Sequence, residues 1–196
     1  MELISDTLKI NRQNIINAFP RELKSDVEVV IEFLFQKDFD FDIGHYQEIT
    51  LNAEKLFIPK RVYFDEPSGI DDLSNLQKTN LNCIYLRHYN GFVRQHSLEL
   101  LINSMDYFVV PYIFQLLGEY VVEILFVLDK HINNETIDSY LRFIAENKQY
   151  WQQTESRVGS YWNEYYRTLP KYKKFSNYIG KQIVERIKKS QSKINS

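Results

Sequence analysis

Cysteine is nearly absent from this 196-residue sequence. Cys83 is the single cysteine, so no disulfide can form within the chain. Chains without disulfides are typical of reducing compartments, and we therefore expect a cytoplasmic protein. A chain of this length buries about 70 % of the surface that it exposes when unfolded, which is enough for a stable core without cross-links.

The sequence also lacks a long apolar run that is free of charge. Its most apolar window, 108–128, contains the carboxylates Glu119 and Glu123 and the helix breakers Pro111 and Gly118. Each carboxylate near the centre of a bilayer would cost about 2.5–3.5 kcal/mol. We therefore predict a buried helical hairpin in this window and no membrane partner.

Motifs for catalysis, metal binding and phosphate binding are absent as well. The chain has no Gly-x-Ser-x-Gly elbow and no glycine-rich phosphate loop. No pair of histidines has HxxxH or HExxH spacing; the histidines are His45, His88, His96 and His131. We expect no metal site, no cofactor and no catalytic residues. An enzyme without a recognisable motif is kept as an alternative, because the fold alone does not decide function.

What the sequence does contain is helical periodicity. In 21–36 the apolar residues Leu23, Val27, Val30, Ile31 and Leu34 recur at three- and four-residue spacing, as on one face of a helix. Similar patterns, separated by glycine, asparagine and proline, predict further helices over 11–19, 73–89, 92–102, 107–117, 119–132, 134–145, 148–167 and 175–189.

One region has a different pattern. Residues 49–51, 56–58 and 61–64 are β-branched and aromatic, and Pro59 interrupts them. They predict a small β-hairpin with an edge strand. The breaker Asp65–Gly69 then divides the chain into 1–66, with the first helices and the hairpin, and 67–196, with the remaining helices. We expect a mainly α fold whose two parts pack as one compact domain.

A weak repeat lies in the helical part. Gly91-Phe92-Val93 opens one predicted helix, and Gly118-Glu119-Tyr120-Val121 opens another, each followed by a leucine-rich stretch. Gly91–Leu101 resembles the second helix of a HEAT-type repeat, in which a Val-Arg pair begins the helix. Pro111–Leu125 is similar to the first helix and turn of the next repeat, although Val122 stands where the arginine would be. Over about 73–132, the resemblance implies stacked antiparallel helical hairpins with a concave binding face.

Three residues around the turn between these helices are candidate binding residues. Arg87, His88 and Arg94 flank Asn90-Gly91, next to a predicted helix N-terminus. Backbone N–H groups at such an end attract anions, so these residues could form a phosphate or carboxylate pocket. The alternative is that Arg94 pairs with a carboxylate such as Glu119 and bridges neighbouring repeats.

The C-terminal end of the chain is basic and aromatic. Residues 151–196 have ten Lys and Arg against three Glu, a net charge of +7, while the rest of the chain sums to −9. Aromatic residues alternate with the basic ones, and Tyr166, Arg167, Tyr172 and Lys173 are the candidate surface residues among them. Exposed, such a segment could bind single-stranded nucleic acid by stacking and phosphate contacts. Their helical spacing equally suits a buried core.

Two functions follow from these observations. The absence of motifs, the repeat and the acidic body suggest a non-catalytic module that binds another protein, as a scaffold or as its neutralising partner. The alternative is nucleic-acid binding through the basic, aromatic C-terminal end. The sequence leaves the oligomeric state open.

Overall fold

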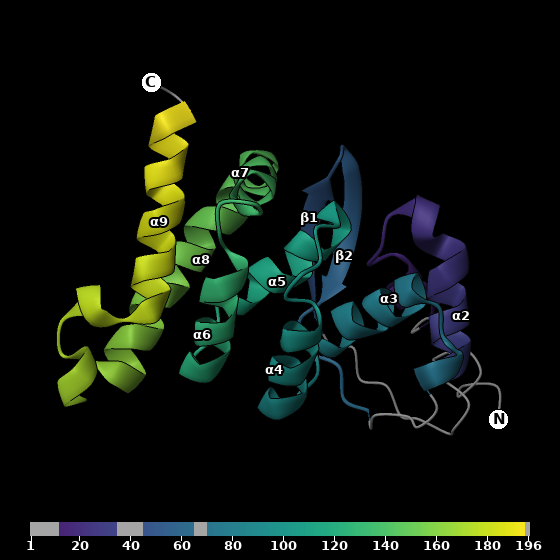
Figure 1. The fold of residues 1–196 in the computed structure, drawn as a ribbon, viewed down its shortest axis with the longest axis horizontal. Coiled ribbons are helices and arrows are strands. Elements are labelled where there is room, and N and C mark those ends of the chain that lie inside the picture. The colour runs from purple at the N-terminus through teal and green to yellow at the C-terminus, as the bar shows by residue number, and fades with distance from the viewer. Residues whose placement is uncertain (1–11, 35–44, 65–69, 195–196) are drawn as a thin grey trace. The chain divides into compact units, whose positions relative to one another are not determined.

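The computed structural model of the chain describes residues 12–34, 45–64 and 70–194 (Figure 1). These residues form a mainly α-helical fold with one small antiparallel sheet, as the sequence predicts. The chain divides into two compact units, Met1–Ser97 and Leu98–Ser196, which we call the N-terminal and the C-terminal unit. The boundary expected at residue 66 falls inside the N-terminal unit. The breaker Asp65–Gly69 lies outside the described residues.

The N-terminal unit begins with helical residues 12–16. Its further elements are η1 (Arg21–Leu23), α2 (Lys24–Leu34), β1 (Tyr46–Leu51), β2 (Glu54–Pro59), η2 (Ile70–Asp72), α3 (Asn75–Tyr85) and the start of α4 (Gly91–Leu100). The periodic apolar residues of α2 are buried, and α2 packs on α3. Ser74 begins α3 with a capping box, in which its hydroxyl accepts from the Gln77 amide and the Gln77 side chain accepts from the Ser74 amide.

The sheet has two strands, each longer than the segment predicted for it. β1 and β2 pair antiparallel around a turn at Asn52 and Ala53, both of which have positive φ, 53° and 64°. Such a pair of residues makes the tight turn whose twist suits two antiparallel strands. The third β-like segment, 61–64, does not extend this sheet. Val62 instead forms an isolated parallel bridge with His88, the residue that follows the end of α3 by three positions.

The C-terminal unit is helical throughout its described part. Its elements after α4 are η3 (Tyr107–Val109), α5 (Val110–Leu116), α6 (Val122–His131), α7 (Ile137–Glu146), α8 (Lys148–Tyr161), the π-helix η4 (Trp162–Tyr166), η5 (Pro170–Tyr172), η6 (Phe175–Asn177) and α9 (Ile179–Ile194). Every residue of α5 is buried. Among the described residues, no helix is long and apolar enough to cross a membrane. In the window 108–128, α5 packs on α6, as the predicted helical hairpin requires.

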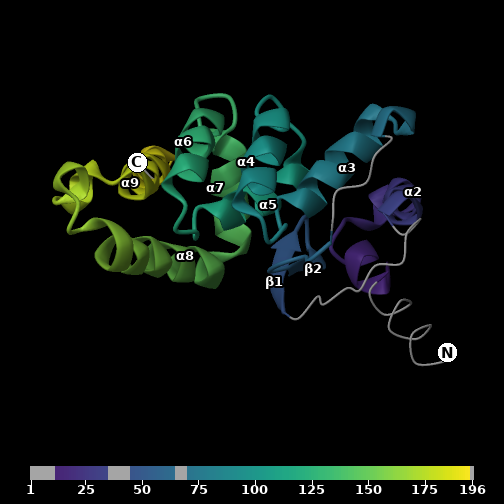
Figure 2. The same cartoon turned by 90° about the horizontal axis from the view of Figure 1, so that it is seen from below.

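Helix α9 completes this unit by packing on α6, α7 and α8. Figures 1 and 2 show α9 running across α8 rather than alongside it. In both views the chain between them turns back through η4, η5 and η6. The prediction of one continuous α-helix over 148–167 is therefore wrong in the last turn, after α8 ends at Tyr161. There the Arg167 N–H donates to the Trp162 carbonyl, five residues earlier, which is the bond of a π-helix.

Gly180 fills a position in this packing that a side chain would disturb. A Cβ atom there would lie 2.8 Å from the Tyr178 ring and 3.2 Å from a Val158 methyl group, and both of those residues are buried. We expect Gly180→Ala to lower the free energy of unfolding by about 1–3 kcal/mol, the usual cost of overpacking. Gly159 in α8 has nothing within 4 Å of its Cβ position. Gly159→Ala should therefore raise stability by about 0.5–1 kcal/mol through helix propensity. Urea denaturation measures the free energy of unfolding of both variants. A change of the same sign in the two variants would contradict this prediction.

A buried histidine lies at the C-terminal end of α6. The Nδ1 atom of His131 is 2.8 Å from the Tyr140 hydroxyl, and the Thr136 hydroxyl donates to the His131 carbonyl. Burial lowers the pKa of His131, and a hydrogen bond to the Ser104 backbone opposes that shift. The folded protein therefore holds this imidazole neutral at a pH where the unfolded chain binds a proton.

This histidine makes stability depend on pH. Because its folded pKa is depressed, the unfolded chain binds more protons below the ordinary histidine pKa of about 6.5, so stability falls as pH falls. We expect the free energy of unfolding to decrease between about pH 7 and pH 5, by at most about 1.4 kcal/mol per pH unit from this group. His131→Gln should flatten that slope in urea titrations. His96→Gln, at an exposed position, is the matched control and should keep the slope. Equal slopes in the wild type and His131→Gln would contradict the assignment.

Candidate functional site

The predicted binding residues fall into two groups, one in each unit. Arg87, His88 and Arg94 belong to the N-terminal unit. The C-terminal unit contains the others, which are Glu119, Tyr166, Arg167, Tyr172 and Lys173. Each group is built from different contacts, and the two groups offer different chemistry.

In the N-terminal unit, His88 is a structural residue. Its Nε2 atom lies 2.5 Å from the Phe64 carbonyl oxygen, and its Nδ1 atom accepts from the Asn90 backbone N–H at 3.1 Å. A carbonyl can only accept and an amide N–H can only donate, so the ring carries its proton on Nε2. Both nitrogens are thus used in holding the chain around the turn, and neither is directed at a ligand.

Arg94 has a similar role at the start of α4. Its Nη1 atom donates to the carbonyls of His88 at 2.7 Å and Tyr89 at 2.9 Å. Its side chain is only 2 % exposed, and Arg87 and His88 are buried as well. The guanidinium therefore binds the end of the preceding chain segment. The three predicted pocket residues lie together, but they lie beneath the surface.

The surface over this turn is aromatic, a feature that the sequence analysis missed. The rings of Tyr63 and Tyr89 stack at 5.8 Å with an interplanar angle of 13°. Both are half-exposed, and Phe92, at the first turn of α4, is 84 % exposed. We call Tyr63, Tyr89 and Phe92 the turn aromatics. The signal for them was present at Tyr89 and Phe92, which flank the Asn90-Gly91 turn.

In the C-terminal unit, tyrosines gather where α8 ends and α6 begins. The Tyr120 ring is 5.2 Å from the Tyr165 ring and 6.0 Å from the Tyr161 ring, measured between centroids. Tyr161 and Tyr165 are themselves 6.1 Å apart. Tyr120 is 47 % exposed and Tyr165 is 50 % exposed. The three rings form a cluster that presents aromatic surface to solvent.

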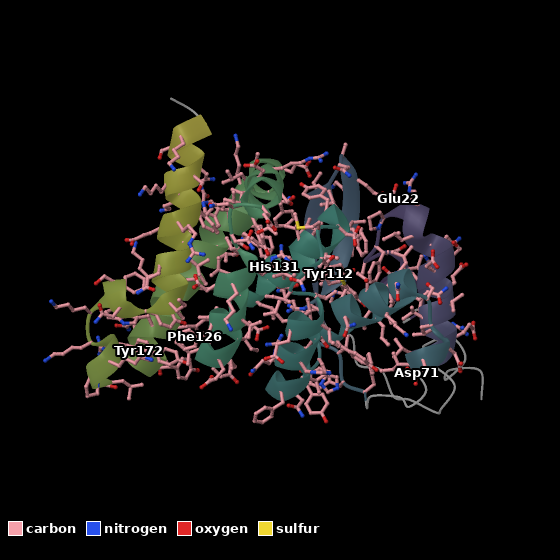
Figure 3. All side chains as sticks on the ribbon, in the orientation of Figure 1. Glu22, Asp71, Tyr112, Phe126, His131 and Tyr172 are labelled. Carbon is pink, nitrogen blue, oxygen red and sulfur yellow. The ribbon has the colours of Figure 1, made fainter. Side chains whose placement is uncertain are left out.

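Basic residues follow this cluster along the chain. Lys171 places its Nζ atom 5.2 Å from the Phe126 ring and 5.1 Å from the Tyr172 ring; Figure 3 labels both rings. Arg167 donates to the Asn163 side-chain oxygen at 2.9 Å. Lys173 and the next residue, Lys174, are exposed. We use the name aromatic–basic surface for the following residues: Tyr120, Phe126, Tyr161, Tyr165, Arg167, Lys171, Lys173 and Lys174.

Three cations of α9 have carboxylate partners. Lys181, Arg186 and Lys188 form ion pairs with Glu185, Asp129 and Glu155. Within the described part of the chain, no carboxylate pairs with the four cations of the aromatic–basic surface. Their positive charge is therefore available to an anion.

The remaining predicted residues are placed differently. Tyr172, expected near the surface, is buried, and Tyr166 is half-buried with its hydroxyl bonded to the backbone of Tyr120. Glu119 is buried. Arg167 and Lys173 are exposed as expected. Among the described residues, no group of three His, Cys, Asp or Glu side chains could hold a metal ion.

Comparison with known proteins adds no ligand to this geometry. The chain matches no protein-family model, no curated protein and no solved structure. The function is therefore argued from the turn aromatics and the aromatic–basic surface, each from its own contacts, exposure and charge.

Proposed function

We propose that the chain is a non-catalytic binding protein whose C-terminal unit binds single-stranded nucleic acid through the aromatic–basic surface. One observation carries the proposal: four cations without a carboxylate partner in the described part of the chain follow a cluster of three tyrosines, of which Tyr120 and Tyr165 are exposed. This ranks nucleic acid above the protein partner that the sequence alone favoured.

The two components of the surface suit the two components of the ligand. Exposed lysine and arginine neutralise phosphates and release the counterions that the nucleic acid had condensed. Exposed tyrosine rings stack with bases, at about 1–3 kcal/mol per base, whatever the sequence. Duplexes keep their base faces stacked inside, so these rings favour a single strand over a duplex.

Charge-matched variants test this proposal. Lys173→Gln/Lys174→Gln removes two unpaired cations, and Lys181→Gln/Lys188→Gln removes two paired ones, so both double variants change the net charge by the same amount. We expect the first variant to make the negative slope of log affinity against log salt shallower by about 1.4, because each phosphate contact to a single strand contributes about −0.7 to that slope. The second variant should leave the slope close to that of the wild type.

The measurement is fluorescence anisotropy with a labelled oligonucleotide of about 12 nucleotides, repeated from roughly 50 to 200 mM salt. A duplex of the same sequence is the second probe and should bind more weakly. Equal slopes for the two double variants, or no binding by the wild type at low salt, would overturn the proposal.

A protein partner is the second candidate, and the turn aromatics favour it. Phe92 exposes 84 % of its surface, and the adjoining turn is fixed by the buried Arg94 and His88. Rigid exposed aromatic residues are typical anchors of protein interfaces. The acidic remainder of the chain, with its net charge of −9, would suit a basic partner.

This second candidate has a different signature from the first. Phe92→Ser should abolish capture of the partner, because an anchor typically contributes about 2 kcal/mol or more. Lys173→Gln/Lys174→Gln should leave that capture intact. Pull-downs from nuclease-treated extract with both variants give the comparison. A captured protein that is retained by Phe92→Ser would exclude the turn aromatics as its binding site.

We further propose that residues 73–132 are HEAT-like helices and that the protein works in the cytoplasm. Support for the repeat comes from Phe92 and Tyr120, which occupy equivalent positions and are both exposed. The cytoplasmic location is supported by the single cysteine, Cys83, which is buried and forms no disulfide within the chain.

A further inference from the structure

We propose that Tyr166 is a positioning residue: its hydroxyl fixes the backbone at the start of α6 and thereby holds the Tyr120 ring in the stacking surface. The role in ligand binding rests on the proposed function. The role in positioning rests on contacts within the C-terminal unit alone.

The hydroxyl of Tyr166 joins two backbone groups on either side of Val121. It donates to the Tyr120 carbonyl oxygen and accepts from the Val122 N–H at 3.2 Å. Helix α6 begins at Val122, and its N-cap residue, Val121, provides no side-chain hydrogen bond. The first amides of a helix have no partner within the helix. Tyr166 therefore provides, from a distant segment, the cap that the local sequence lacks.

The π-helix makes this contact compatible with the tyrosine cluster. Tyr165 and Tyr166 are consecutive, yet the ring of Tyr165 lies against the ring of Tyr120 while the hydroxyl of Tyr166 reaches the backbone of Tyr120. The wider turn of a π-helix reduces the angle between successive side chains, so both can face residue 120. Such turns are rare and occur frequently at functional sites.

The Tyr166 ring is held from the other side by the core. It stacks on the Tyr178 ring at 5.1 Å and meets the Tyr172 ring edge-on at 5.5 Å. Tyr172 and Tyr178 are buried. Burial is also the main cause that raises the pKa of Tyr166, so its hydroxyl keeps the proton that it donates. Ring and hydroxyl are thus both fixed, and Tyr166 has little freedom to contact a ligand itself.

Tyr166→Phe removes this hydroxyl and leaves the ring in place. Tyr107→Phe is the matched control, since it removes a hydroxyl from a half-buried ring of the same unit that lies outside the aromatic–basic surface. In the free protein, Tyr166→Phe should speed hydrogen exchange of the Val122 amide at least tenfold and shift the ring NMR signals of Tyr120. It should weaken oligonucleotide binding about tenfold, with the salt slope unchanged because no charge is lost. Tyr107→Phe should change none of these.

The outcomes separate the two proposals. An unchanged Val122 exchange rate and unchanged Tyr120 signals in Tyr166→Phe would overturn the positioning role. Faster exchange with wild-type oligonucleotide affinity would overturn the link between positioning and binding. If the wild type binds no oligonucleotide, the proposed function fails and the role in binding fails with it. Faster exchange in Tyr166→Phe would then still establish the hydroxyl as the cap of α6.

Discussion

The arrangement of both units depends on one constraint, namely that backbone polar groups at the ends of buried helices must find hydrogen-bond partners. A buried amide or carbonyl without a partner costs about 1–3 kcal/mol. Helix ends leave several such groups free. In this chain, long side chains from other segments provide partners. Arg94 binds two carbonyls ahead of α4, Tyr166 binds the start of α6, and Arg186 of α9 donates to the Asp129 and Ile132 carbonyls at the end of α6.

The same contacts hold the backbone of two aromatic residues whose rings reach the surface. The buried Arg94 donates to the Tyr89 carbonyl, and the half-exposed Tyr89 ring stacks on Tyr63. Tyr166 holds the Tyr120 carbonyl in the same manner, and the Tyr120 ring joins the exposed cluster. In both units, therefore, a fixed backbone carbonyl accompanies an exposed aromatic side chain. A ring on a fixed backbone loses less conformational entropy on binding, which favours recognition.

Much of the fold could be predicted because periodicity is a local signal. Spacing alone identified α2 with its buried face, the antiparallel hairpin and most later helices. The contacts that cap the helices leave no such signal. Tyr166 lies 46 residues from Tyr120, and Arg186 lies 57 residues from Asp129. For the same reason Arg94 and His88 read as a possible anion pocket, although their polar atoms bind backbone groups beneath the surface.

The aromatic C-terminal segment shows why composition could not separate core from surface. Tyr150 and Trp151 face the core from α8, as their helical spacing suggests. Beyond Tyr161 the π-helix changes the angle between successive side chains, so helical spacing no longer predicts which of them face the core. Ion pairs distinguish the side chains that pack within the fold from those that remain available at the surface. In α9, Arg186 and Lys188 pair with carboxylates, whereas no carboxylate in the described residues pairs with Lys171, Lys173 or Lys174. An ion pair within the fold offers little to a ligand, because its charge is already neutralised. An unpaired, exposed cation keeps its full attraction for an anion, and on this difference we propose the aromatic–basic surface as the site for nucleic acid.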